Sequence, residues 1–480
     1  MGKVGTMWPM RRKQPGAAIE LEITDLAYGG EGVGRHEGQV QFVAGAYPGE
    51  RVRAEPQSGR KRWQRARLLE VLTPSADRVS PLCSHTEVCG GCVYQTLAYP
   101  AQLAAKAKQV REALARIGGF CPPEPEPPLA APVLQGYRNK MDFSFAPRAW
   151  DPAGVPTEPR PDPALGLHVR GRFDAVFDLR DCALCDPAVN EIVARLRGQA
   201  SSLGLTGYHG GRATGLLRHL IVRSSRATGE HLLALVVSEE DDRLPELARA
   251  VCDGHPRIAG FLLWIHTGLA SIATAEREIL LLGNARITER LLDLEFELSA
   301  SSFFQTNSSA AESLLTELRA ICRPAETILD LYCGVGTLGL ALAGRCRALV
   351  GIESVGPAVE DARRNAARNG IAHARYMSAT AEDWLAEASA LRPDLVILDP
   401  PRAGLHPRAM KGLLALAPPR ILYVSCNPTT LARDLHHLSA SGYVADRMRI
   451  LDLFPHTPHV ETIVLMERRE ADRPVGGSAL

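Results

Sequence analysis

The chain has 480 residues, and its 55 Lys and Arg side chains against 54 Asp and Glu give a formal net charge of +1. Apolar residues make up 45% and charged residues 23%, which is a globular composition and excludes wholesale disorder, a collagen-like rod or a coiled coil. At about 100–200 residues per domain, the length predicts two to four domains. The balanced charge also argues against a nucleic-acid binder, which usually carries a basic surplus.

The charge is distributed unevenly along the chain. Residues 1–75 carry 12 basic and 8 acidic side chains, residues 76–325 carry 26 and 29, and residues 326–480 carry 17 of each. Between Arg51 and Arg67 there are seven basic residues, one acid and Trp63. This stretch is either a solvated strand face or a surface that contacts an RNA backbone.

Short alternating segments separated by glycine-rich turns fill the N-terminal part, at residues 18–23, 39–43, 51–54 and 66–71. One turn is assigned to the run of Gly29, Gly30, Gly32 and Gly34. Short strands at even spacing predict a small antiparallel β-barrel over residues 15–74.

The middle of the chain, residues 75–325, mixes the two kinds of element. Strands are expected at residues 216–224, 232–237 and 257–265, and helices at residues 101–117, 187–198 and 242–253. This mixture predicts a central α+β domain. No apolar run approaches the 18 residues of a membrane span.

Cysteine usage points to a reducing compartment, and therefore to the cytoplasm. The chain has 11 cysteines and no apolar signal core, so a disulfide framework is not expected. Three cysteines follow the pattern Cys83-x5-Cys89-Gly-Gly-Cys92. With a fourth thiolate from elsewhere, such a set suits either zinc or a 4Fe–4S cluster.

Residues 326–470 predict a doubly wound α/β domain, because continuous apolar strands alternate with amphipathic helices. The strands are expected at residues 328–332, 348–352, 395–398 and 421–424. The helices are expected at residues 336–343, 357–369, 381–391, 407–416 and 429–441. Residues 443–453 and 460–467 predict a terminal antiparallel pair.

The first strand of this domain leads into the loop DLYCGVGTLG, with glycines at 334, 336 and 339. A glycine-rich loop between strand and helix can bind a dinucleotide or S-adenosylmethionine (SAM), and Glu353 after the next strand can bind ribose hydroxyls. Asp330, just before the loop, favours SAM because the sulfonium and amino groups of SAM are cationic.

Three further motifs lie at the carboxyl edge of the same sheet. Asp399-Pro-Pro-Arg402 ends a strand, at the edge where open α/β sheets bind ligands. Cys426, in Ser-Cys-Asn-Pro, lies near a helix N-terminus, which is expected to lower the pKa of its thiol. The final motif, FPHTPHVET, places the Glu461 carboxylate at the start of the last strand, and the alternative is a metal site of His456, His459 and Glu461.

In their joint order these motifs resemble the RNA uracil-C5 methyltransferase family, in the branch that carries a TRAM domain and acts on 23S ribosomal RNA. The resemblance covers nearly the whole chain, from GGEGVGR through the cysteine cluster, YRNK, FFQTN, DLYCGVGTLGL, DPPRAG and SCNP to HVET. It implies that Cys426 is the nucleophile and Glu461 the general base. The SAM contacts that we expect are Gln305, Tyr332, Gly334, Thr337, Glu353 and Asp399.

The resemblance also implies a 4Fe–4S cluster held by Cys83, Cys89, Cys92 and Cys182, with Cys185 as the alternative fourth ligand. The partner is then RNA, 23S rRNA before tRNA, and the protein is expected to be a monomer. The expected reaction forms a covalent bond between Cys426 and C6 of a uridine, methylates C5, and ends with loss of the C5 proton and elimination.

Other functions explain fewer of these residues. A cytosine-C5 methyltransferase needs a further cysteine where Pro401 and Arg402 stand. An amino-group methyltransferase leaves Cys426 and Glu461 without a role, and a NAD oxidoreductase explains only the glycine loop. A non-catalytic RNA-binding module is the alternative outside the enzymes.

Overall fold

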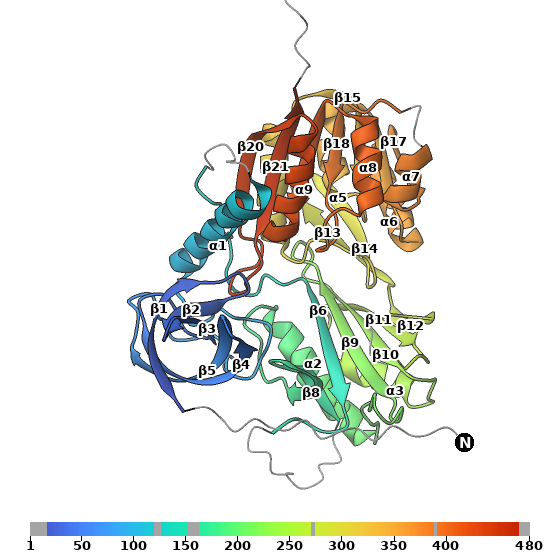
Figure 1. Cartoon of the computed structure of the whole chain (residues 1–480). Helices are drawn as coiled ribbons and strands as arrows, with labels where there is room; N and C mark the ends of the chain where they lie inside the picture. Colours follow the sequence, from blue (N-terminus) through green and yellow to red (C-terminus); the bar gives the residue numbers. More distant parts are fainter. Residues whose placement is uncertain (1–16, 120–125, 152–162, 270–273, 388–390, 470–480) are drawn as a thin grey trace, which may run out of the picture.

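A computed structural model describes residues 17–119, 126–151, 163–269, 274–387 and 391–469. Figure 1 shows an N-terminal barrel, a central sheet packed with helices, and a C-terminal sheet with helices on both faces. None of the described helices combines the length and the apolar character needed to cross a membrane.

The N-terminal strands close into a barrel in the order β1-β2-β3-β5-β4. They are β1 (Ile19–Leu26), β2 (Glu31–His36), β3 (Gln39–Ala44), β4 (Arg51–Arg60) and β5 (Trp63–Thr73). The expected barrel is confirmed, although β3 and β5 pair in parallel.

The glycine-rich turn of this barrel is shorter than expected. Gly29 and Gly30 have φ of +102° and +91° and form the turn, whereas Gly32 and Gly34 lie inside β2. A Cβ atom at Gly32 would lie 2.4 Å from the Ala46 carbonyl oxygen. Glycine is required in this strand because neighbouring backbone approaches it closely.

The central body is a seven-stranded mixed sheet in the order β12-β11-β10-β9-β6-β7-β8. Its strands are β6 (Lys140–Ala146), β7 (Ala164–Val169), β8 (Arg172–Asp178), β9 (Leu217–Ser224), β10 (His231–Val237), β11 (Ile258–Ile265) and β12 (Arg277–Gly283). The helices α2 (Pro187–Ser202) and α3 (Leu244–Cys252) bury apolar side chains in the same core as this sheet.

The C-terminal sheet has the order β17-β16-β15-β18-β19-β21-β20. Its strands are β15 (Ala325–Leu331), β16 (Cys346–Glu353), β17 (Ala374–Ser378), β18 (Leu395–Leu398), β19 (Arg420–Ser425), β20 (Tyr443–Leu451) and β21 (Glu461–Arg468). The first five are parallel, and β21 runs antiparallel between β19 and β20. The doubly wound domain and its terminal antiparallel pair are therefore confirmed.

Helices from distant parts of the sequence cover this sheet. The set is α1 (Tyr99–Ala113), α4 (Ser308–Ile321), α5 (Thr337–Leu342), α6 (Gly356–Arg368), α7 (Ala381–Glu387), α8 (Pro407–Leu416) and α9 (Pro428–Ala440). A hairpin of β13 (Arg286–Leu291) and β14 (Leu294–Ser299) packs with α4.

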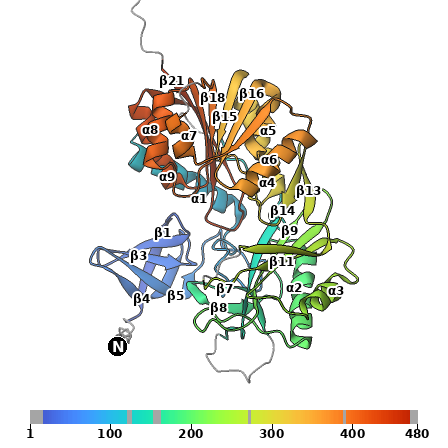
Figure 2. The same cartoon turned by 90° about the vertical axis from the view of Figure 1, so that its right-hand side faces the viewer.

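Helix α1 precedes the central sheet in sequence but packs against α9. Its Val110 side chain, and Leu114 in the π-helical turn that follows, share an apolar cluster with Leu435 and Leu438. In both views α1 lies between the barrel and the C-terminal body (Figure 1, Figure 2).

The segment between β20 and β21, residues 452–460, is called the 452–460 loop. Lys106 of α1 donates from Nζ to Asp452 Oδ1 at 2.7 Å and to the Phe454 carbonyl at 3.0 Å, and both side chains of the ion pair are fully buried. Gln102 accepts from the His456 backbone N–H at 2.9 Å. Helix α1 therefore fixes the loop that leads directly to Glu461.

The same loop receives hydrogen bonds from two other parts of the chain. The backbone N–H groups of Val93 and Tyr94 both donate to the His456 carbonyl at 3.0 Å. Tyr137 donates from its hydroxyl to the Pro455 carbonyl at 2.9 Å. The 452–460 loop is thus the point at which α1, the central body and residues 83–94 meet. Residues 83–94 are called the cysteine segment.

Replacing Lys106 tests this anchor. Lys106→Ala leaves Asp452 buried without its partner and should lower the free energy of unfolding by about 3–5 kcal/mol. Lys108→Ala, on the same helix with an exposed ion pair to Asp25, should cost about 0–1 kcal/mol. Urea denaturation measures both, and equal losses in the two variants would contradict the anchoring role.

Candidate active site

Strand register brings five of the expected site residues to one edge of the C-terminal sheet. Leu331 pairs with Ile352 and with Leu398, so the residues that follow β15, end β16 and follow β18 are neighbours. Ser425 pairs with Thr462, which sets the residue after β19 beside the start of β21. The five residues that meet at this edge are Tyr332, Glu353, Asp399, Cys426 and Glu461.

The glycine loop is held in the form that a strand-to-helix turn requires. Gly334 and Gly336 have φ of +55° and +85°, and Tyr332 also has positive φ. Glu353 accepts from the Gly334 backbone N–H at 3.1 Å, and its other oxygen accepts from Val355 N–H at 2.8 Å. Thr337 begins helix α5 and is 7% exposed.

Asp330 does not have the role suggested by its charge. Its side chain is fully buried and accepts from the Gly339 backbone N–H at 3.0 Å. Burial raises the pKa of this carboxyl to about 8. The residue fixes the start of α5 rather than offering an exposed anion to a cationic ligand.

Gln305 reaches the site on the segment between β14 and α4. Asn139 donates from Nδ2 to the Gln305 carbonyl at 2.8 Å, and the buried Arg223 guanidinium donates to the Ser302 carbonyl. The neighbouring Phe303 ring is 64% exposed and lies 3.9 Å from where a Cβ on Gly334 would be. The central body therefore places this segment over the glycine loop.

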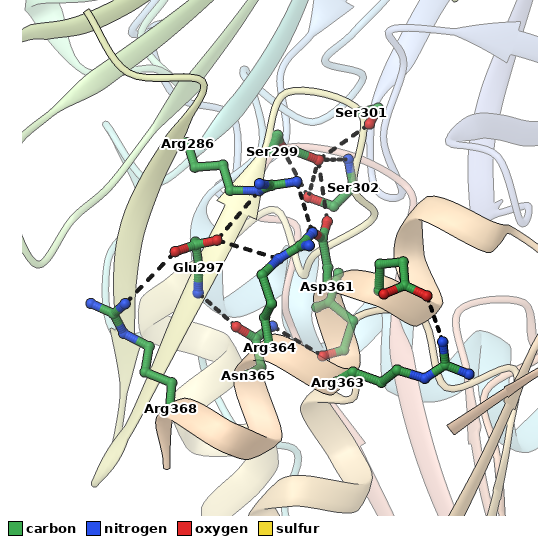
Figure 3. Close-up of polar contacts among 12 residues, drawn as sticks. Arg286, Glu297, Ser299, Ser301, Ser302, Asp361, Arg363, Arg364, Asn365 and Arg368 are labelled. Carbon is green, nitrogen blue, oxygen red and sulfur yellow. Dashed lines mark hydrogen bonds and ion pairs between the residues drawn. The ribbon is translucent and has the colours of Figure 1, made fainter. Parts of the chain in front are cut away.

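A polar network ties the start of the same segment to α6, as Figure 3 shows. Ser299 donates to Asp361 at 3.2 Å, and the Glu297 backbone N–H donates to Asn365 at 2.8 Å. Arg286 lies 3.4 Å from the Glu297 carboxylate. The second half of the β14 strand is thereby attached to α6 of the C-terminal domain.

The Cys426 thiol is less acidic than its helix-terminus position suggested. Burial, followed by the charges of Glu461 and Asp399, raises its pKa to about 11, while the Arg402 guanidinium acts in the opposite direction. Asn427 caps α9 by accepting from Thr429 N–H, so the helix end already has an acceptor. The expected lowering of the thiol pKa is therefore wrong.

The two carboxyl groups also favour their neutral forms. Burial raises the pKa of Asp399 to about 7. Burial, and then the charge of Asp399, raises the pKa of Glu461 well above its usual range. Glu461 is 3% exposed, and its Oε1 has no hydrogen-bond partner within the described residues. This oxygen is free to exchange a proton with a ligand.

Arg402 is a site residue that the sequence reasoning missed, and His459, which was considered only as a metal ligand, is its partner. Arg402 contacts the Cys426 thiol and donates to His459 Nε2 at 3.0 Å. Burial, followed by the charge of Arg402, lowers the pKa of His459 to about 4, which keeps the imidazole neutral. The signal was present in the DPPR motif, because a cation beside a nucleophilic thiol favours the thiolate.

The expected cysteines come together in a pocket away from the catalytic edge. Cys83, Cys89, Cys92 and Cys182 all line it, whereas Cys185 does not and is 2% exposed. Backbone N–H groups of His85 and Gly91 lie 3.4 Å and 3.3 Å from the sulfurs of Cys83 and Cys89.

No group of three or more His, Cys, Asp or Glu side chains within the described residues is arranged to hold a metal ion. This finding also removes the alternative of His456, His459 and Glu461 as metal ligands. The ten cysteines of the described ranges are free thiols.

Comparison with known proteins shows which family the fold belongs to. The family described as tRNA (Uracil-5-)-methyltransferase matches residues 269–469, and the TRAM domain matches residues 12–66. A protein of Chlorobaculum tepidum named as an uncharacterized RNA methyltransferase is 39% identical, over 96% of this chain and 98% of that protein. The chain belongs to the RNA uracil-5-methyltransferase family.

Further relatives agree with this assignment. A Nitratidesulfovibrio vulgaris protein, also named as an uncharacterized RNA methyltransferase, is 36% identical over 95% of this chain and 97% of that protein. The crystal structure of Pyrococcus abyssi tRNA (uracil-54, C5)-methyltransferase with S-adenosyl-L-homocysteine superposes with a TM-score of 0.74. It is 30% identical, and the match covers 93% of this chain and 99% of that chain.

The chain is therefore a SAM-dependent RNA (uracil-C5)-methyltransferase with an N-terminal TRAM domain. The C-terminal sheet is its methyltransferase domain, and RNA is its substrate. The expectation of this family from the motifs is confirmed.

The raised pKa of Cys426 predicts alkaline activation of its thiol. Only the thiolate reacts, so alkylation of Cys426 by iodoacetamide should accelerate about tenfold per pH unit between pH 7 and 9. Peptide mass spectrometry measures this rate residue by residue. A rate that levels off below pH 8 would contradict the dominance of burial.

Two arginine variants refine the measurement. Arg402→Ala removes the cation beside the thiol and should slow alkylation at pH 8. Arg408→Ala, whose exposed side chain pairs with Asp383, is the matched control and should leave the rate unchanged.

Proposed function

We propose that this enzyme methylates C5 of one specific uridine in RNA through a covalent adduct between Cys426 and C6 of the base. The proposal is supported above all by one observation: the strand register that gathers Cys426, Glu461 and Asp399 at a single sheet edge. A thiol, a buried carboxyl and a second acid at one edge suit this chemistry, which gives each of the three a role.

Cys426 and Glu461 act at different steps of the proposed reaction. The Cys426 thiolate, favoured by Arg402, attacks C6, which makes C5 nucleophilic. SAM supplies the methyl group that C5 then takes up. Glu461 removes the C5 proton through its unpartnered Oε1, and the sulfur of Cys426 leaves C6 as the double bond re-forms.

The other expected residues are proposed to hold SAM. Tyr332 follows β15, and Glu353 ends the adjacent strand β16. Gly334 lies in the loop after β15, and Thr337 is the first residue of helix α5. Gln305 enters from the segment that lies above this loop. Asp399, between the SAM residues and Cys426 in the register, is proposed to position the SAM amino group or the base.

We propose 23S rRNA as the substrate, with tRNA as the second candidate. The tRNA candidate rests on the Pyrococcus abyssi structural relative, which acts on tRNA uridine 54. In either RNA the target base must leave its stack to reach the sheet edge, so a loop or a flipped nucleotide is expected.

The basic stretch of the barrel contributes to RNA binding at its turn. Four of its arginines form ion pairs with acids of the barrel: Arg51, Arg53, Arg65 and Arg67. Arg60, Lys61 and Arg62 form none within the described residues and are exposed at the β4–β5 turn. We propose these three as the phosphate contacts.

We further propose that the cysteine pocket holds a 4Fe–4S cluster. Four cysteine sulfurs around one pocket, with N–H groups directed at two of them, suit a cluster whose sulfurs accept hydrogen bonds. The cluster supplies no electrons to the methylation, so its role is to order the segment that carries it.

We propose the division into domains at residues 15–74, 75–325 and 326–470, a monomeric state and a cytoplasmic location.

Covalent capture tests both the mechanism and the substrate. Total RNA containing 5-fluorouridine, incubated with enzyme and SAM, should form a stable adduct through Cys426, because fluorine blocks the final proton removal. Sequencing of the captured RNA then distinguishes 23S rRNA from tRNA. Cys426→Ser should abolish capture, and Cys252→Ser, at the end of α3, should retain it.

Glu461→Gln provides the complementary result. Without the general base, methylation should fall by about 10²–10⁴-fold. The methylated adduct should also accumulate on ordinary RNA. Capture of no RNA by wild-type enzyme that binds SAM would refute the adduct mechanism.

Iron content tests the cluster. Protein purified without oxygen should be brown and contain about four irons per chain. Cys182→Ser should lose the iron, whereas Cys185→Ser, whose sulfur lies outside the pocket, should retain most of it. A colourless protein with one zinc, or an equal loss in both variants, would contradict the assignment.

A further inference from the structure

The barrel turn that contains Gly29 and Gly30 presents an aromatic ring. Ala27 N–H donates to the Glu31 carbonyl at 2.9 Å and Gly30 N–H to the Ala27 carbonyl at 3.0 Å, which closes a tight turn around Tyr28. The Tyr28 side chain is 40% exposed at the tip of this turn. Its hydroxyl forms no hydrogen bond within the described residues, so the barrel itself gives the ring no partner.

The turn is held from behind by α1. Gln109 donates from Nε2 to the carbonyls of Leu26 and Ala27 at 3.2 and 3.1 Å. Lys108 forms an ion pair with Asp25 at 2.5 Å. The same helix anchors the 452–460 loop, so the Tyr28 turn and the loop before Glu461 have a common support.

The cysteine segment provides a second support. A Cβ on Gly30 would lie 2.7 Å from Val93 Cγ2 and 3.2 Å from Tyr94 Cε1, so the turn packs directly on this segment. The backbone N–H groups of these same two residues bind the His456 carbonyl. Glycine at position 30 is therefore required for the barrel to dock beside the 452–460 loop.

The docked turn brings Tyr28 within electrostatic range of the catalytic groups. Burial raises the pKa of its phenol, the charge of the Cys426 thiolate raises it further, and Arg402 lowers it. Glu461 also raises it. The ring is therefore carried near Cys426 and Glu461 by a turn that packs on Val93 and Tyr94, the two residues that hold the 452–460 loop.

We propose that Tyr28 is an RNA-contacting residue of the active site, whose ring stacks on the base that enters it. The TRAM domain then contributes to the active site itself, in addition to the phosphate contacts proposed at its β4–β5 turn. This inference rests on the proposed function, because it needs an unstacked base at Cys426. Every base has a π-face, and an exposed aromatic ring is the usual platform for an unpaired one.

Steady-state kinetics with the captured RNA test the proposal. Base–aromatic stacking implies that Tyr28→Ala raises KM for RNA about 5- to 150-fold, with a smaller change in kcat and unchanged SAM binding. Tyr28→Phe keeps the ring and should stay within about twofold of wild type. Leu69→Ala, which truncates another exposed apolar side chain of the barrel, is the matched control.

A second measurement uses the wild-type protein alone. Ultraviolet irradiation of the covalent 5-fluorouridine complex should crosslink the peptide that contains Tyr28 to the RNA, as peptide mass spectrometry can detect. Wild-type capture without this crosslink, or a Tyr28→Ala enzyme with unchanged KM, would overturn the role of Tyr28. Failure of wild-type capture would instead refute the proposed function, so the two failures are distinguishable.

Discussion

The buried ion pair between Lys106 and Asp452 joins residues that are 346 positions apart in the sequence. Two buried charges are costly to desolvate, so the pair contributes less to net stability than to a unique arrangement. Only one placement of α1 against the 452–460 loop brings the charges into contact. That placement sets Glu461 at the sheet edge, and through Gln109 and Val93 it also sets the position of the barrel.

The YRNK motif has a structural explanation in the same arrangement. Tyr137 binds the Pro455 carbonyl, the Arg138 backbone N–H binds the Leu184 carbonyl at 2.8 Å, and Asn139 binds the Gln305 carbonyl. Three consecutive residues thus connect the 452–460 loop, the cysteine pocket and the segment over the glycine loop. Such a motif identifies a family in sequence although its side chains take no direct part in the proposed chemistry.

The sequence predicted best what depends on local pattern. Cys426 and Asp399 each follow a short apolar strand, and parallel strands end at a common edge, so their meeting could be foreseen. The position of α1, the glycines inside β2 and the Tyr28 turn could not be, because each depends on contacts between distant segments. The sign of the Cys426 pKa shift was missed for the same reason: the helix end is local, whereas burial and the two carboxyl groups come from neighbouring strands.

The electrostatics of this sheet edge explain how it tolerates three acids. Burial favours the neutral forms of Cys426, Asp399 and Glu461, and each ionised group would raise the pKa of the others. Arg402 is the cation in contact with the thiol. A cationic ligand beside Asp399 would lower the pKa of all three acids together, since a positive charge stabilises each anion. Ionisation of the nucleophile and of the base is thereby coupled to occupancy of the site, which protects the thiol when no substrate is bound.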